Sequence, residues 1–186
     1  MNDKFIRNQL FKQLYKENAK FNDTLIVNEF NVCNGLARID VAVLNGSIHG
    51  YEIKSDFDTL YRLPNQIYFY NKSLDRITLT TTRKHLSEIK KLVPKWWGIL
   101  LAIQKDNNIE LKEIRKPKDN PEKDLNAFLE LLWKTELIQI IINNNLKYNK
   151  NANREKLSSV IINNLNTDNI YNDVRYFLKS RKSWRI

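Results

Sequence analysis

The sequence predicts a mixed α/β fold in which helices flank a mixed central sheet and a helical extension follows it. Up to residue 116, short apolar segments rich in Val, Ile and Leu alternate with amphipathic helical segments. After Pro121 the apolar residues recur at helical spacing only. We therefore expect a core over residues 1–116 and a helical C-terminal extension or cap over residues 122–186.

The composition is that of a globular protein with a strong excess of positive charge. Of the 186 residues, 42% are hydrophobic and 28% charged, and 31 basic against 21 acidic residues give a formal net charge of +10. Such an excess favours a polyanionic partner, most often nucleic acid, and we expect DNA. No apolar run approaches the roughly 20 residues that cross a bilayer, and the N-terminus lacks a signal-peptide pattern, so a cytoplasmic location is expected.

Cysteine and histidine usage limits the kind of metal site that the chain can form. The single cysteine, Cys33, excludes a disulfide framework and a Cys-rich zinc site. His49 and His85 do not have a metal-ligand spacing. A metal ion would therefore be bound by oxygen atoms, which favours Mg²⁺, Mn²⁺ or Ca²⁺ over Zn²⁺.

The N-terminal segment predicts a helix followed by a strand. Over residues 3–20, apolar side chains recur at helical spacing and basic residues occupy much of the other face. Residues 24–30 (TLIVNEF) are rich in strand-forming residues and place Glu29 near the end of the strand.

Residues 37–44 and 48–54 predict a β-hairpin, because two apolar segments flank Asn45-Gly46, the strongest short hairpin signal. A two-residue loop would place Asp40 and Glu52 on opposite faces of the sheet. For these two carboxylates to share a site, we expect a three-residue loop or a bulge at Gly50.

The following segment, residues 55–71, leads into and forms a helix. Ser55, Asp56 and Asp58 are typical of helix starts, and Pro64 suits a first turn. Gln66 and Tyr70 are four residues apart and therefore project from one face.

The remaining segments alternate and then become helical. We expect a strand over residues 76–82, a helix over 84–91, strands over 97–104 and 109–114, a linker over 115–121, one long helix from Leu125 to Ile141, and helices over 154–164 and 167–178.

An acid within an apolar strand, such as Asp40, is costly to bury unless it is paired or bound to a metal. Asp40, Glu52 and the carbonyl of Ile53 could bind Mg²⁺ (or Mn²⁺), and Glu29 could add a further ligand. Lys54 could orient a water molecule or bind a phosphate, with Gln66 and Tyr70 in support. These residues predict a Mg-dependent nuclease that hydrolyses phosphodiester bonds of DNA. The basic residues expected to contact nucleic acid are Arg62, Arg83, Lys84, Lys90, Lys91, Arg181 and Lys182.

The order of elements and the site pattern resemble the PD-(D/E)XK nuclease superfamily. Asp40 matches its metal-binding aspartate, and residues 52–54 (EIK) match its E-x-K pattern, whereas Ile39 replaces the nominal proline. Residues 66–70 (QIYFY) resemble the Q-x-x-x-Y signature of the RecB-like and lambda-exonuclease-like branches. The resemblance implies a restriction-endonuclease-like fold and a metal-dependent nuclease.

A second resemblance covers nearly the whole chain. The segments RIDVAVLNGSIHGYEIKSDFDTLYRLPNQIYFYNKSLDRITLTT, WWGILLA and LELLWKTEL resemble an uncharacterised bacterial family named after an sce-type locus label. That family implies a nuclease-like fold without a settled substrate.

Two alternatives to the nuclease interpretation stay open, because a D-x11-E-x-K pattern also arises by chance on a solvated hairpin face. One is a non-catalytic module that binds nucleic acid and keeps the same fold. The other is a phage or defence-system interaction protein whose basic face binds an acidic partner.

Overall fold

The computed structural model describes residues 1–21, 23–106 and 108–181 and contains one six-stranded mixed sheet. The strands lie in chain order: β1 (Leu25–Val32), β2 (Ala37–Leu44), β3 (Ile48–Lys54), β4 (Arg76–Thr81), β5 (Gly98–Lys105) and β6 (Asn108–Arg115). Strands β3, β4 and β5 are parallel, and the other neighbours are antiparallel. The mixed α/β prediction is confirmed.

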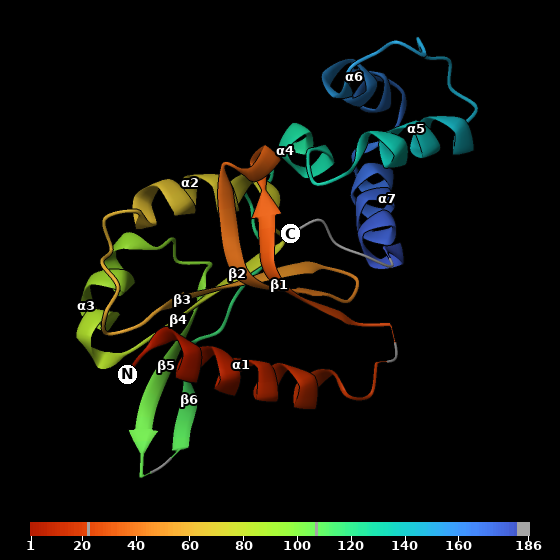
Figure 1. The fold of residues 1–186 in the computed structure, drawn as a ribbon. Helices are drawn as coiled ribbons and strands as arrows, with labels where there is room; N and C mark the ends of the chain where they lie inside the picture. The colour runs from red at the N-terminus through yellow and green to blue at the C-terminus, as the bar shows by residue number, and fades with distance from the viewer. Residues whose placement is uncertain (22, 107, 182–186) are drawn as a thin grey trace.

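Helices cover both faces of this sheet (Figure 1). On one face, α1 (Asp3–Asn18) buries Ile6, Leu10 and Leu14 against Val41 and Val43 of β2. On the other face lie α2 (Leu63–Ser73) and α3 (Arg83–Leu92), which follow the parallel strands β3 and β4. Since both β–α–β connections run in the same direction along the sheet, their helices share one face.

The C-terminal region is helical, as expected, but the predicted helix from Leu125 to Ile141 is wrong. Two helices replace it, α4 (Leu125–Leu129) and α5 (Lys134–Asn143), and they are followed by α6 (Arg154–Asn164) and α7 (Thr167–Ser180). Trp133 between the first two has extended backbone (φ −73°, ψ 157°), and its N–H donates to the Glu136 carboxylate at 2.6 Å. This cap at the start of α5 explains the break.

The C-terminal helices share a hydrophobic core with the sheet. Phe128, Leu137 and Val174 belong to the same buried cluster as Leu44 and Ile48. Figure 1 shows α4 to α7 grouped at one end of the molecule, away from α3. The division at residues 116–122 stays a prediction, because this core continues across it.

The β2–β3 hairpin has the register that the shared site requires. Leu44 pairs with Ile48, so Asn45, Gly46 and Ser47 form a three-residue loop. Gly46 has φ +97°, a left-handed conformation that favours glycine. Gly50 pairs regularly with Ala42, so the alternative of a bulge there is not needed. None of the helices in the described part of the chain is both long and apolar enough to span a bilayer.

Candidate functional site

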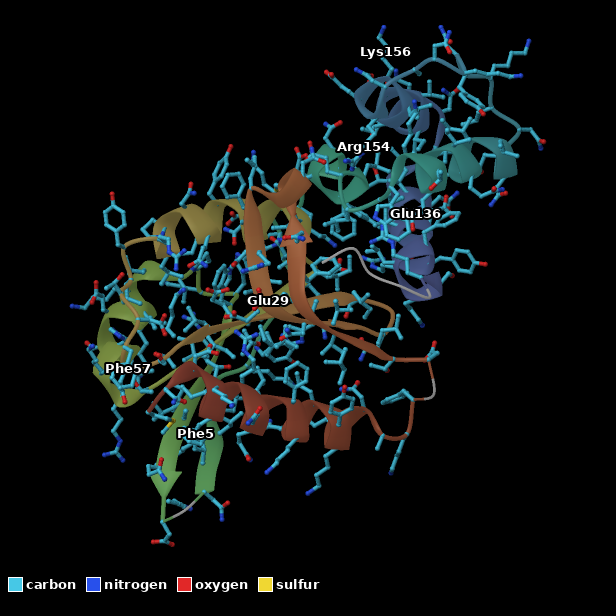
Figure 2. The ribbon with its side chains drawn as sticks, viewed as in Figure 1. Phe5, Glu29, Phe57, Glu136, Arg154 and Lys156 are labelled. Carbon is cyan, nitrogen blue, oxygen red and sulfur yellow. The ribbon has the colours of Figure 1, made fainter. Side chains whose placement is uncertain are left out.

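The site forms at Asp40 of β2, where the regular residue pairing of β2 with β1 and with β3 is interrupted. The β1–β2 pairs pass from Asn28↔Val41 to Phe30↔Ile39, which leaves Glu29 opposite Asp40 without ladder pairing. The β2–β3 pairs end at Val41↔Tyr51, one position before Asp40 and Glu52. Glu29, labelled in Figure 2, has φ +59°, as befits an irregular strand position. Three acids therefore occupy neighbouring positions on three adjacent strands.

Asp40 bridges the gap that these interruptions leave. Its Oδ2 accepts the Ile53 N–H at 2.7 Å, which replaces a ladder hydrogen bond. Its Oδ1 accepts Nη2 of Arg7 from α1 at 2.6 Å, and Arg7 Nη1 donates to the Asp40 carbonyl at 3.1 Å. Burial raises the pKa of Asp40 above its usual value, and Arg7 opposes that rise.

Glu52 lies deeper, with a side chain that is only 3% exposed. Its Oε1 accepts Lys54 Nζ and Gln66 Nε2, both at 2.7 Å, and its Oε2 lies 2.8 Å from the Tyr70 hydroxyl. Burial, together with the nearby Asp40 charge, raises the pKa of Glu52 to about 7 in spite of Lys54. The carboxyl therefore changes protonation state near neutral pH.

The Tyr70 hydroxyl lies between two acceptors, the Arg38 carbonyl and Glu52 Oε2. It lies 2.7 Å from the Arg38 carbonyl and 2.8 Å from Glu52 Oε2, but it has one proton to donate. When that proton goes to Glu52 Oε2, the hydrogen bond stabilises the charged carboxylate and lowers the pKa of Glu52, against the effect of burial. The structure thus brings the predicted residues Glu52, Lys54, Gln66 and Tyr70 into one buried network next to Asp40.

The third acid, Glu29, pairs with arginines. Its carboxylate lies 2.6 Å from Arg38 Nε and 3.4 Å from Arg7 Nη1. Among the described residues, no group of three or more His, Cys, Asp or Glu side chains is arranged to hold a metal ion. Magnesium usually takes one or two protein carboxylates and completes its shell with water. Binding by Asp40, Glu52 and the Ile53 carbonyl stays a prediction.

The network opens into a pocket of about 490 Å³ between β1, β2, β3 and the start of α2, which we call the carboxylate pocket. Asp40, Glu52 and Lys54 contribute to its floor, and Arg62 and Gln66 come from the α2 side. Arg62 is exposed, as expected of a residue that contacts a partner. The pocket therefore contains acids and cations side by side.

The predicted nucleic-acid contacts fall into two groups. On α3, the side chains of Arg83, Lys84, Lys90 and Lys91 are exposed. Arg181 is much less accessible, because its side chain is only 6% exposed, pairs with Glu136 and lies over the Trp133 ring, and its contact with nucleic acid stays a prediction. Lys182 lies outside the described residues.

Sequence reasoning missed Arg7, the cation that holds Asp40. Arg7 follows the buried Ile6 and bonds Asp3 on the preceding turn, with its side chain 18% exposed. A basic residue directly beside the apolar stripe of a helix was the available signal, since such side chains lie at the edge of the buried face.

Comparison with known proteins identifies the family. A family model described as Bacteriophage P4 protein cII matches residues 1–185. The chain belongs to the bacteriophage P4 protein cII family. Protein cII of Enterobacteria phage P4 is 30% identical over 172 residues, which make up 92% of this chain and 64% of that protein. The chain thus spans less than two thirds of this cII relative, and no solved structure matches it.

Membership of the cII family corrects the nuclease interpretation. The assignment to the PD-(D/E)XK superfamily and to the sce-type family is wrong, and with it the assignment of a Mg-dependent nuclease activity. The residues of the D-x11-E-x-K and Q-x-x-x-Y patterns do lie close together in the structure, but short sequence patterns do not identify a family. In this cII-family chain they build a buried network in which Asp40 is paired with Arg7 and Glu52 with Lys54.

Proposed function

We propose that this protein binds DNA without cleaving it, through the exposed cations of α3 and of Arg62. The observation that carries the proposal is the charge distribution of α3, which has four cations and one acid, Glu88. No carboxylate of the described residues lies within ion-pair distance of these four cations. Uncompensated cations on one exposed helix are typical of surfaces that bind phosphates.

The loop between β3 and α2 connects α3 to the carboxylate pocket, so the proposed DNA-binding surface extends from α3 to Arg62. Lys84 Nζ donates to the carbonyl of Asp56, in the loop that leads from β3 to Arg62. Arg62 lines the pocket from the far end of the same loop. A DNA backbone that follows α3 would reach the carboxylate pocket along this loop. The sequence favours the cytoplasm as the compartment in which this binding takes place.

In this proposal, the acids of the pocket do not perform catalysis. Asp40 and Glu52 are already paired with Arg7 and Lys54, so a divalent cation would have to displace protein cations in order to bind. Binding of Mg²⁺ or Mn²⁺ is therefore a separable part of the proposal. We expect it to be weak and to be lost in Asp40→Asn, as measured by isothermal titration with Mn²⁺.

The main test is fluorescence anisotropy with a labelled 20-mer DNA at several salt concentrations. We expect binding that weakens steeply with salt, because released counterions drive it. Lys90→Glu/Lys91→Glu should weaken binding by at least about tenfold and reduce the salt slope by about two. The matched control is Lys147→Glu/Lys150→Glu, which reverses two exposed charges beyond α5.

Two results would contradict the proposal. If the wild-type protein does not bind DNA at low salt, the protein-partner alternative is favoured instead. If the α3 variant and its control weaken binding equally, the α3 surface is not the contact. In addition, DNA incubated with the protein and Mg²⁺ should remain intact on a denaturing gel.

A further inference from the structure

The loop between β3 and α2 displays two aromatic side chains to solvent. Phe57 is 80% exposed and Tyr61 is 91% exposed, the highest values among the large hydrophobic side chains of the described residues. Phe57 lies at the end of the molecule that carries α3, away from the C-terminal helices (Figure 2). Exposed aromatics in a close pair along the chain are typical of binding surfaces rather than of random surface composition.

The loop is held in place on both sides of Phe57. Asp58 Oδ2 accepts the N–H of Ser55 at 2.8 Å and also its hydroxyl. The Thr82 hydroxyl donates to Asp56 Oδ1 and so fixes the loop to the start of α3. These bonds order the backbone while Phe57 stays in solvent, so little conformational entropy would be lost when a ligand packs on it.

Tyr61 is anchored in a similar way. The preceding residue, Leu60, belongs to the hydrophobic core, and the Leu63 N–H donates to the Leu60 carbonyl at 3.0 Å. Arg62 directly follows Tyr61 and lines the carboxylate pocket. Each aromatic therefore has a cation close by in the fold, Lys84 beside the Phe57 turn and Arg62 beside Tyr61.

We propose that Phe57 and Tyr61 form a stacking platform for unpaired bases, so that the nucleic acid bound here is single-stranded. This inference rests on the proposed function and specifies its substrate class. Every base has a π-face that an aromatic ring can cover, but in a duplex neighbouring base pairs already cover these faces. The neighbouring cations bind the phosphates while the rings bind the bases, the combination found in sequence-tolerant binding of single strands.

The test compares the affinity of a fluorescein-labelled dT20 oligonucleotide with that of a 20-bp duplex by anisotropy. We expect the wild-type chain to prefer dT20. Phe57→Ala/Tyr61→Ala should weaken dT20 binding by about 30-fold, the loss of two stacked bases, and leave duplex binding nearly unchanged. Its salt slope for dT20 should stay that of the wild type, because no phosphate contact is removed.

Two further variants complete the test. Tyr15→Ala/Tyr176→Ala removes two exposed tyrosines from α1 and α7, 61% and 65% exposed, and should not change dT20 affinity. Phe57→Trp/Tyr61→Trp keeps two aromatic faces and should retain tight binding. Because all four changes lie on exposed side chains, folding is expected to be preserved, which circular dichroism checks.

The outcomes separate this inference from the proposed function. Loss of dT20 binding in the alanine variant, with retention in the tryptophan variant, supports the stacking platform. If the wild-type protein binds DNA but the alanine variant binds dT20 equally well, the platform is refuted and the DNA-binding proposal stands. If the wild-type protein binds neither dT20 nor the 20-bp duplex, both proposals fail together.

Discussion

Two buried acids of this molecule, Asp75 and Glu52, have opposite electrostatic environments. Asp75 precedes β4 at the junction with the C-terminal helices, and its side chain is 5% exposed. Arg175 binds it through Nε and Nη2 at 2.9 and 2.6 Å, Lys123 donates at 2.9 Å, and the Ile48 N–H at 2.8 Å. Burial alone would raise the pKa of Asp75, but these donors outweigh it and lower that pKa.

Glu52 is buried to a similar degree, yet its pKa is raised to about 7. It has one cation, Lys54, and faces a second acid, Asp40, whereas Asp75 has two cations and a backbone donor. Asp75 therefore joins the C-terminal helices to the sheet as a satisfied anion. Glu52 accepts three hydrogen bonds but has a single cation, and it lies beside an open pocket, the kind of place where shifted pKa values cluster. The comparison separates an acid whose pKa is lowered by several donors from one whose pKa is raised by burial and a neighbouring acid.

The largest effect on stability should come from Asp75→Asn. It leaves Arg175 and Lys123 without their buried anion, so we expect the free energy of unfolding to fall by about 3–5 kcal/mol, measured by urea denaturation at pH 7. Asp119→Asn breaks the exposed pair with Arg76 and is the control, with an expected loss below about 1 kcal/mol. Equal urea midpoints for the two variants would contradict the assignment of Asp75 as the main electrostatic link between the sheet and the C-terminal helices.

The pH dependence of stability should have opposite signs at the two acids. The raised pKa of Glu52 means that its contribution is present below its ordinary pKa of 4.5 and is lost as pH rises through about 7. Relative to Glu52→Gln, the wild type should lose about 3 kcal/mol of unfolding free energy between pH 4.5 and 8. Urea denaturation at each pH measures this difference.

Asp75 provides the matched comparison for that experiment. Its lowered pKa means that its contribution is present above its ordinary pKa of 3.8 and is lost as pH falls through the folded-state pKa. In acid, the unfolding free energy of the wild type should therefore approach that of Asp75→Asn. In the same pH range, the unfolding free energy of the wild type relative to Glu52→Gln should be at its highest. If both differences in unfolding free energy changed in the same direction with pH, the opposite pKa shifts of Glu52 and Asp75 would be contradicted.

A smaller effect is expected from Tyr70→Phe. The change removes the hydroxyl between the Arg38 carbonyl and Glu52, and we expect a loss of about 1–2 kcal/mol in unfolding free energy. Because the Tyr70 hydrogen bond lowers the pKa of Glu52, that pKa should rise further in the variant, as measured by carboxyl ¹³C NMR. Tyr176→Phe, on an exposed side chain, is the control, and an unchanged Glu52 titration in Tyr70→Phe would count against the network.

Local patterns predicted most of the secondary structure and part of the site. Alternating apolar residues around Asn45-Gly46 defined the hairpin, and the requirement that Asp40 and Glu52 share a site anticipated its three-residue loop. The i, i+4 spacing of Gln66 and Tyr70 placed both on the face of α2 that contacts Glu52. These predictions succeeded because they depend on periodicity and turn geometry, which are local.

The same reasoning failed where distant segments meet. The pairing of Arg181, expected only as a nucleic-acid contact, with Glu136, 45 residues earlier, could not be read from the sequence. The nuclease interpretation was wrong, because a correct spatial grouping of residues does not establish a family or an activity.

The sequence by itself determined most of the strands and helices, apart from the break between α4 and α5, together with the positive net charge and the membership of residues 1–185 in the cII family. Only the tertiary structure decided which cation neutralises which acid: Arg7 reaches Asp40 across 33 positions and Arg175 reaches Asp75 across 100. Charge pairing acts over a few ångströms in space regardless of separation along the chain, so it depends on how the elements pack. That packing left Glu52 with a single cation beside a pocket, and left Phe57 and Tyr61 in solvent on the loop between β3 and α2.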